Sequence, residues 1–266
     1  MTEQSQLLDI NKIITSLVEK NFERVFTRVK KEVKDKFTKT KIDFNFAFKT
    51  YLEKAYSKYS RIKTLIYRTE PKYIYDFFEC NDLRFNGQKF SAQSADVILE
   101  ISKFLIIQGS GGIGKSTLMK HIFVDTLLHG QLIPVFVELR DINDFKGSLF
   151  EFIHNSMSKL GFNYDEEYFK YAMEEGCFLF LLDGYDEVLS SKSTELFRQI
   201  DELCDRYEDN YYCISSRPVE SFIAFQRFCV LKSQPLNKLQ AISLVNKIDY
   251  DKDVKAKFLS KLDSEL

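Results

Sequence analysis

Two short segments of the sequence contain residue types that could bind and cleave a phosphate group. The first is GSGGIGKST, Gly109 to Thr117, which matches the pattern G-x-x-x-x-G-K-[ST] in full. The second is FLFLLDGYDEV, Phe178 to Val188, in which an apolar run ends on an aspartate and two more acids follow. Phosphoryl transfer needs both kinds of group, because cations neutralise phosphate charge and carboxylates hold a metal ion or a water.

The first segment predicts a phosphate-binding loop between a strand and a helix. Glycines allow positive φ, so successive backbone N–H groups can point at an anion, and the helix beginning near Lys115 adds the positive end of its dipole. We expect Lys115 to reach the β- and γ-phosphates, Ser116 to bind Mg²⁺ and Thr117 to contact a more distal phosphate. The residues assigned to nucleotide binding are Gly109, Ser110, Gly111, Gly112, Ile113, Gly114, Lys115, Ser116 and Thr117. The guanine-specifying pattern N-K-x-D does not occur in the sequence, which favours ATP.

The acids of the second segment, Asp183, Asp186 and Glu187, can divide two tasks. Asp183 ends a predicted strand, so its carboxylate is expected beside the phosphate loop as a ligand or close partner of Mg²⁺. Asp186 and Glu187 follow one tight turn later, where either could orient and polarise a water for attack on the γ-phosphate. Alternatively, Asp186 and Glu187 only cap the next helix.

Strands and helices alternate from Lys103 onward, which predicts an α/β domain with a mostly parallel sheet. The predicted strands are KFLIIQ, LIPVFVEL, CFLFLLD, YYCISS and RFCVLK. The predicted helices are an amphipathic helix Lys115–Leu128, then Leu149–Leu160, Glu166–Glu175, Thr194–Tyr207 and the last thirty residues.

The sequence before Lys103 predicts mainly helices. Apolar residues recur in steps of three and four from Ile10 to Phe37, typical of one long amphipathic helix, and a second helix is expected to begin near Asp43. Seven Lys and Arg between Arg28 and Lys41 form either a solvated face or a patch for nucleic acid or an acidic partner. KTLIY could be a short strand, and Asn86-Gly87 is a turn signal.

Composition excludes several classes of protein. The 266 residues are 44% hydrophobic and 29% charged, with a formal net charge of −1, so the overall charge predicts no nucleic-acid binder. Five scattered cysteines without a CxxC pair and only three histidines argue against a disulfide framework or a zinc site. There is no signal-peptide pattern and no apolar run near the roughly 20 residues that span a bilayer. We therefore expect a cytoplasmic protein without membrane partners.

The acid-rich segment resembles the NACHT family of signalling NTPases. The shared pattern is an apolar strand followed by Asp, a tiny residue, another residue and a paired Asp-Glu. Further segments agree: IPVFVELRD resembles the second strand of the family, CISSRP the fourth strand with its sensor arginine, and LKSQPLNKLQAISLV the fifth strand leading into a helical subdomain. The resemblance covers the sequence from about Phe90 to the C-terminus.

The resemblance implies a P-loop NTPase sheet with an additional strand, in the order 5-1-4-3-2, preceded by an all-helical N-terminal region. It makes Arg217 a sensor of the γ-phosphate, although an arginine at a strand end could equally pair with Asp186. The implied catalytic residues are then Asp186, Glu187 and Arg217, and the implied metal ligands are Ser116 and Asp183. The implied cofactors are ATP or ADP and Mg²⁺.

The expected organisation is a helical region 1–60, a connecting segment 61–97, an NTPase core 98–233 and the start of a helical subdomain 234–266. Family members usually continue through a winged helix and a C-terminal sensor of repeats. The sequence stops before both, so we expect either a fragment of a longer protein or a reduced form.

The expected function is that of an ATP-binding, slowly hydrolysing NTPase whose nucleotide state controls self-association. Its N-terminal helices would serve as an effector, adaptor or oligomerisation element, and its trigger would be a protein. The resemblance extends to immune-type proteins that answer phage infection. Two alternatives are a scaffold that binds nucleotide without hydrolysing it and a motor-like ATPase acting on nucleic acid or protein. Steady hydrolysis of ATP would argue against the scaffold, and stimulation of that hydrolysis by DNA or RNA would indicate the motor.

Overall fold

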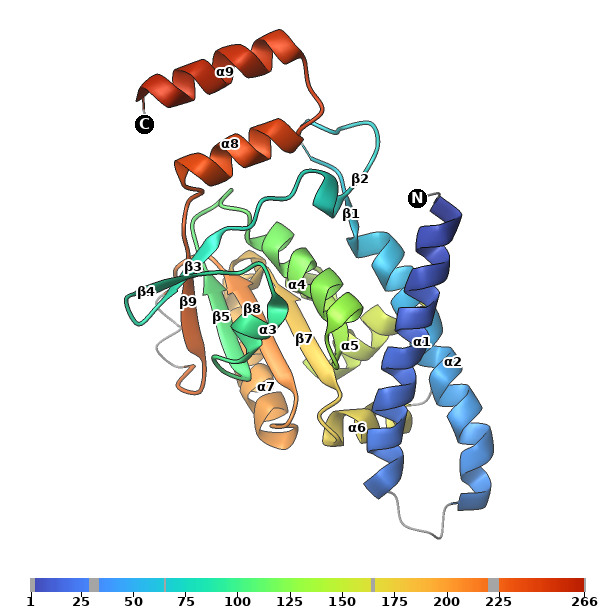
Figure 1. Cartoon of the computed structure of the whole chain (residues 1–266). Coiled ribbons are helices and arrows are strands. Elements are labelled where there is room, and N and C mark those ends of the chain that lie inside the picture. Colours follow the sequence, from blue (N-terminus) through green and yellow to red (C-terminus); the bar gives the residue numbers. More distant parts are fainter. Residues whose placement is uncertain (1–2, 29–33, 65, 164–165, 220–224, 266) are drawn as a thin grey trace.

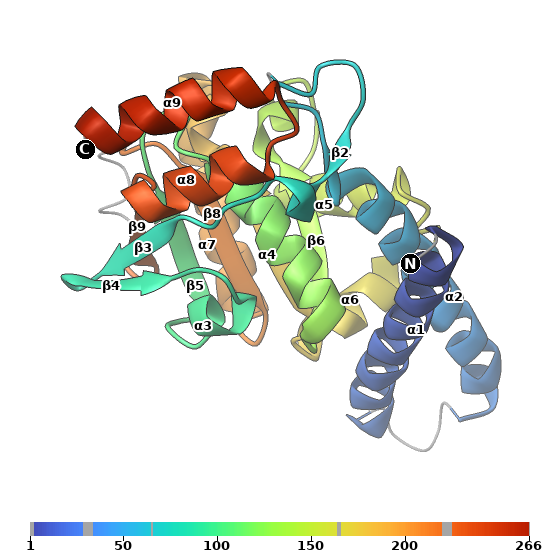
Figure 2. The same cartoon turned by 45° about the horizontal axis from the view of Figure 1, so that its top comes forward.

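The computed structural model describes residues 3–28, 34–64, 66–163, 166–219 and 225–265. These residues form a seven-stranded sheet, a two-stranded ribbon and surrounding helices (Figures 1 and 2). The strands of the large sheet are, in spatial order, β4 (Gln88–Ser91), β3 (Asp82–Phe85), β9 (Cys229–Ser233), β5 (Phe104–Gln108), β8 (Tyr211–Ser216), β7 (Phe178–Asp183) and β6 (Ile133–Glu138).

The part of the sheet from β9 to β6 is parallel and confirms the expected strand order. Numbered from the phosphate-loop strand β5 along the chain, these strands lie in the order 5-1-4-3-2. Parallel strands are covered on both faces, which is why their sequences read as continuous apolar runs. In β7, for example, every residue before the terminal Asp183 is buried.

A hairpin extends the sheet on the other side of β9. Strand β3 pairs antiparallel with both β9 and β4, and Asn86 and Gly87 form the turn with φ of 49° and 82°. The turn signal at Asn86-Gly87 is confirmed. The pairing with β9 was not predicted, because such short strands show too little alternation to be recognised.

Helices pack on both sides of the sheet, with α3 and α4 on one face and α7 on the other (Figures 1 and 2). The helices that follow β4 are α3 (Ala95–Leu99), α4 (Lys115–His129), α5 (Leu149–Ser158), α6 (Glu166–Glu174), α7 (Ser190–Arg206), α8 (Lys238–Lys247) and α9 (Lys252–Glu265). The predicted helices are present, although α7 begins four residues earlier than expected. Helix α4 is buried on most of its circumference rather than amphipathic, because α1, α2 and α3 cover the side away from the sheet.

The N-terminal region forms a pair of helices, α1 (Glu3–Arg28) and α2 (Lys34–Tyr59). The expectation of one helix up to Phe37 is wrong, since Phe37 belongs to α2; Val29 and Val33 lie outside the described residues. The expected start of the second helix near Asp43 is also wrong. The lysine-rich segment before Asp43 has good helix propensity and no glycine or proline, so α2 extends through it.

Both helices of this pair pack on α4, and α1 also contacts β6, the last strand of the sheet (Figure 2). Ile14, Phe22, Phe48 and Leu52 are buried in the contact. The Tyr51 hydroxyl donates a hydrogen bond of 3.1 Å to the carbonyl of Pro134 in β6. An edge strand with unpaired backbone groups can pair with strands of other chains. In this protein, the hydrogen bond from Tyr51 of α2 occupies one backbone carbonyl on β6.

A short ribbon connects α2 to the sheet. Strands β1 (Arg61–Ile62) and β2 (Lys72–Tyr73) pair antiparallel, followed by a 3-10 turn, η2 (Ile74–Asp76). The prediction of a strand at KTLIY is wrong in position. Leu65 lies outside the described residues. The Thr64 hydroxyl accepts the N–H groups of Ile66 and Tyr67, hydrogen bonds that are typical of a turn. Within the described part of the chain, no helix combines the length and apolarity needed to cross a bilayer.

Candidate nucleotide site

The candidate site lies where β5, β7 and β8 end, because the carboxyl ends of parallel strands meet at one edge of a sheet. The phosphate loop, Gly109–Thr117, connects β5 to α4. Gly112 and Gly114 have φ of 78° and 95°, which a residue with a side chain rarely adopts. Gly114 is the N-cap of α4, so the loop passes directly into the positive end of a fifteen-residue helix.

Lys115 is folded back over this loop. Its ammonium group donates to the carbonyls of Gly109 and Ser110 at 2.8 and 3.0 Å. Partial burial lowers the pKa of Lys115, and the carboxylates of Asp186, Asp183 and Glu187 oppose that change.

Asp183 is held by hydroxyl groups. Ser215, at the end of the neighbouring strand β8, donates to the Asp183 carboxylate and accepts the N–H of Gly184 at 2.9 Å. Burial raises the pKa of Asp183, while hydrogen bonds from Ser215 and Ser116 lower it. Ser116 and Asp183 thus present two oxygen ligands side by side, which fits Mg²⁺ when phosphates and water complete its coordination. Among the described residues, no cluster of three or more His, Cys, Asp or Glu side chains could hold a metal unaided.

Asp186 and Arg217 form an ion pair across the ends of β7 and β8. The Asp186 carboxylate accepts the backbone N–H of Arg217 at 2.9 Å and lies 3.0 Å from its Nε. The Arg217 guanidinium also reaches the phosphate loop, since a Cβ placed on Gly111 would lie 3.5 Å from its Cζ. The Arg217 side chain thus pairs with Asp186 and also lies against the phosphate loop, while its role as a sensor of the γ-phosphate stays a prediction.

Glu187 is more open to solvent. Its side chain is 49% exposed, against 13% for Asp186, and the Arg140 guanidinium lies 4.0 Å away. Asp186 and Glu187 belong to a 3-10 turn, η4 (Tyr185–Glu187), while α7 has Leu189 as its N-cap and no side-chain cap. The alternative that these acids cap the next helix is therefore wrong.

Three residues that contact the site were not predicted. Ser215 fixes Asp183, Asn143 donates to the carbonyl of Glu187 and accepts the N–H of Leu189, and the amide of Asn81 donates to the carbonyl of Ile113 in the phosphate loop. Ser215 could have been found as a hydroxyl residue at a strand end next to Arg217. Asn81 and Asn143 lie in segments without periodicity or motif, so the sequence has no signal for them.

Comparison with known protein families identifies the family. The sequence pattern that defines the NACHT domain matches residues 103–248, which is more than half of the chain and includes the phosphate loop, the three acids and Arg217. The chain belongs to the NACHT family. NACHT domains are nucleotide-binding P-loop NTPases, so the resemblance carried by Asp183, Asp186 and Glu187 is confirmed at the level of the family. The roles of individual side chains stay predictions.

Two solved structures show a more distant similarity. Domain III of the replication initiation protein DnaA from Thermotoga maritima is 18% identical, with a TM-score of 0.39 over 60% of this chain and 72% of that chain. PCH-2 from C. elegans is 17% identical, with a TM-score of 0.36 over 56% and 40% of the two chains. No curated protein sequence matches this NACHT chain.

Proposed function

We propose that this NACHT chain binds ATP with Mg²⁺, hydrolyses it slowly and uses its nucleotide state to control self-association. The observation that carries the proposal is the position of the phosphate loop. The loop passes into the N-terminus of α4 and lies against Arg217, at the sheet edge where β7 ends on Asp183. The three carboxylates at this edge differ in environment: Asp183 is half-buried and bonded to Ser215, Asp186 is paired with Arg217 and Glu187 is exposed. A merely structural acid cluster would not need a phosphate loop beside it.

The residues of the site divide the work. The loop N–H groups and Lys115 hold the phosphates. Ser116 and Asp183 hold Mg²⁺, which neutralises phosphate charge when it is bound. Glu187 orients the attacking water, because its exposed carboxylate can accept a proton from water while the Asp186 carboxylate is engaged by Arg217. Arg217 lies close enough to Gly111 to respond to the γ-phosphate.

In the cell, we place this switch in a signalling pathway of the immune type, in which a protein trigger promotes ATP binding and assembly. Defence against phage is the setting that the family resemblance suggests. The self-association can be measured by sedimentation of the protein with ADP and with a non-hydrolysable ATP analogue. A sedimentation coefficient that is the same in both states would contradict control of assembly by nucleotide.

The first experiment is to release copurified nucleotide by heating and to identify it by chromatography, with Lys115→Ala as the matched variant. Bound ADP or ATP in the parent protein and its loss in Lys115→Ala is the expected result. If the parent protein neither copurifies with nucleotide nor binds added ATP, the proposed function fails. Binding without any steady-state release of phosphate would instead identify a nucleotide-binding scaffold.

A further inference from the structure

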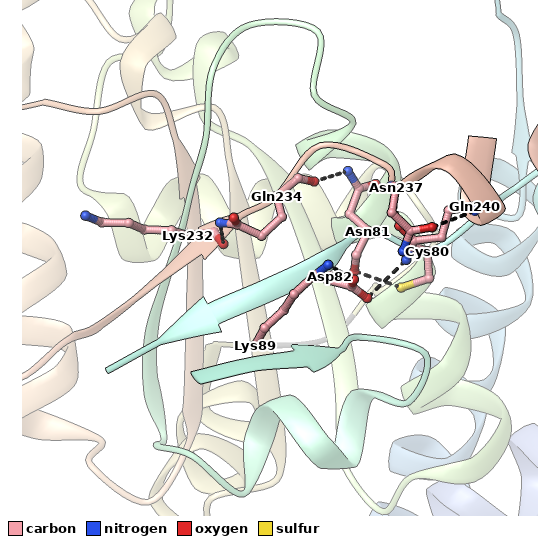
Figure 3. A network of polar contacts seen from close by, with 8 residues as sticks. All are labelled: Cys80, Asn81, Asp82, Lys89, Lys232, Gln234, Asn237 and Gln240. Carbon is pink, nitrogen blue, oxygen red and sulfur yellow. Dashed lines mark hydrogen bonds and ion pairs between the residues drawn. The ribbon is translucent and has the colours of Figure 1, made fainter. Parts of the chain in front are cut away.

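A segment upstream of the NTPase core joins the phosphate loop to helix α8. This segment, called here the Asn81 segment, comprises Phe78–Asp82 and enters strand β3 (Figure 3). Asn81 is only 6% exposed. Its Nδ2 donates to the carbonyl of Ile113 in the phosphate loop at 3.0 Å and to the carbonyl of Gln234 at 2.9 Å. Both acceptors are backbone carbonyls, so the position requires a group that can donate two hydrogen bonds.

The contact with Ile113 has a direct consequence for phosphate binding. The carbonyl of Ile113 and the N–H of Gly114 belong to one planar peptide unit, in which they point in opposite directions. When Asn81 holds the carbonyl, it also fixes the direction of the Gly114 N–H at the start of α4. Asn81 therefore orients one of the loop donors without itself facing the phosphates.

Helix α8 is attached to the other side of the same segment. Gln240 occupies the N3 position of a capping box, where its Oε1 accepts the N–H of Asn237 at 2.8 Å. Its Nε2 donates to the carbonyl of Cys80 at 3.1 Å and to the carboxylate of Asp82 at 3.0 Å (Figure 3). One side chain thus bonds the start of α8 to both neighbours of Asn81.

Further polar contacts attach α8 to the Asn81 segment. Ser243 and Lys247, which follow Gln240 on the same face of the helix, both bind the Glu79 carboxylate, and Lys247 also donates to the carbonyl of Phe78. None of the ten residues of α8 is buried. Its apolar residues Ile242, Leu244 and Val245 are only half-buried. Hydrogen bonds and one ion pair, each of modest net strength, therefore contribute much of what holds α8 in this position, so α8 can separate and return.

We infer that Asn81 and Gln240 are positioning residues that couple the docking of α8 to the geometry of the phosphate loop. The inference rests on the proposed nucleotide binding and deepens it. Docked α8 stabilises the Asn81 segment, Asn81 orients the Ile113–Gly114 peptide, and nucleotide binds more tightly. Because such coupling is reciprocal, bound nucleotide strengthens the docking of α8 by the same factor.

The test is a double-mutant cycle on the dissociation constants for ADP and ATP, measured by calorimetry. Asn81→Leu removes the two hydrogen bonds, and Gln240→Glu keeps an oxygen for the Asn237 N–H but loses the donor to Cys80. We expect Asn81→Leu to weaken nucleotide binding about tenfold or more. Gln240→Glu should weaken binding several-fold in the parent protein and have no further effect in the Asn81→Leu background. Asn246→Asp makes the same change from amide to acid at an exposed position of α8; it is the matched control and should bind as the parent does.

A second readout follows the helix directly. Addition of ADP should slow hydrogen exchange in Lys238–Lys247 of the parent protein, and Gln240→Glu should abolish this response. Equal dissociation constants in all variants would overturn the inference, as would a Gln240→Glu effect that persists in the Asn81→Leu background. If the parent protein binds neither ADP nor ATP, the proposed function itself fails, which is a different result.

Discussion

At the scale of single residues, the three acids of the FLFLLDGYDEV segment differ in environment rather than in type. Asp183 is half-buried and accepts a hydrogen bond from Ser215, and its partial burial raises its pKa. Asp186 neutralises Arg217, and Glu187 meets solvent. In the proposed function these acids have three different tasks, namely metal binding, orientation of an arginine and activation of a water, and each task requires a different environment. The site can therefore be dissected one side chain at a time.

Replacement of Lys115 tests the phosphate loop. Lys115→Ala removes the ammonium of the loop, and hydrogen bonds to charged groups contribute about 1.5–3 kcal/mol, so the affinity for ATP should fall by about tenfold or more. Calorimetric titration with ATP and Mg²⁺ measures the effect. Lys257→Ala, on the exposed surface of α9, removes one positive charge outside the loop and should bind normally. Equal affinities of the two variants would exclude Lys115 from phosphate binding.

Glu187 and Asp186 can be separated by their kinetics. Glu187→Gln should retain ATP affinity and lower the turnover number by about 10² or more, because the amide cannot accept a proton from water. Asp186→Asn weakens the ion pair with Arg217 and should also change the affinity for ATP relative to ADP. Phosphate release at saturating ATP gives the turnover, and titration gives the affinities. Unchanged turnover in Glu187→Gln would transfer the catalytic role to Asp186.

At the scale of elements, α4 is the centre of the structure, since the sheet, the N-terminal helices and the segment before β5 all pack on it. His121 connects α4 to that segment. Its Nε2 lies 3.2 and 3.1 Å from the carbonyls of Ala92 and Gln93, and its Nδ1 lies 3.0 Å from the Tyr75 hydroxyl. Two carbonyls at Nε2 identify it as the protonated nitrogen, so the neutral ring satisfies all these contacts.

The pH dependence of protein stability should reveal the protonation of the buried His121. Burial lowers the pKa of His121 in the folded state, and the Asp125 carboxylate only partly opposes the shift. Above the unfolded pKa of about 6.5 the ring is neutral in both states, and stability is lost as the pH falls below that value, because the unfolded state takes up the proton first. Thermal unfolding of the parent and His121→Gln at pH 7.5, 6.5 and 5.5 measures the difference. The melting temperature should change less with pH in His121→Gln than in the parent protein. An equal change in both would contradict a lowered pKa of His121 in the folded state.

At the scale of the whole molecule, the N-terminal helix pair is part of the packed core. Phe48 of α2 is fully buried, with its ring 4.7 Å from that of Phe162 and 5.8 Å from that of Phe178 in β7. An effector role for these helices would therefore have to operate while they remain packed, or after separation from β6. Separation would expose both the edge of β6 and the apolar surface of α4.

Two neighbouring phenylalanines measure how strongly α2 is attached. Phe48→Ala should lower the free energy of unfolding by about 3–5 kcal/mol, as expected for a fully buried aromatic side chain. Phe46→Ala, only two residues away but 68% exposed, should change it by no more than about 0.5 kcal/mol. Denaturant titration of both variants gives the comparison. Similar small effects would mean that α2 contributes little to the stability of the core.

The sequence by itself determined the elements whose signals are local. The phosphate loop is a contiguous motif, and the buried parallel strands are continuous apolar runs, so Gly109–Thr117, Asp183 and the parallel strands were all recognisable. The strand order followed from the family resemblance. The start of α2 and the position of β1 were misplaced, because propensity and turn hydrogen bonds near Asp43 and Thr64 outweigh the apolar pattern there.

Only the tertiary structure decided how remote side chains complete the site. Asn81 bonds to Ile113 and to Gln234, which are 32 and 153 residues away, and Gln240 reaches the same segment from α8. The pairing of Arg217 with Asp186 likewise depends on β8 lying beside β7. A hydrogen bond from a side chain to a distant backbone carbonyl requires only one donor in the right place. It leaves no periodicity or composition in the sequence, because the acceptor is present in every residue.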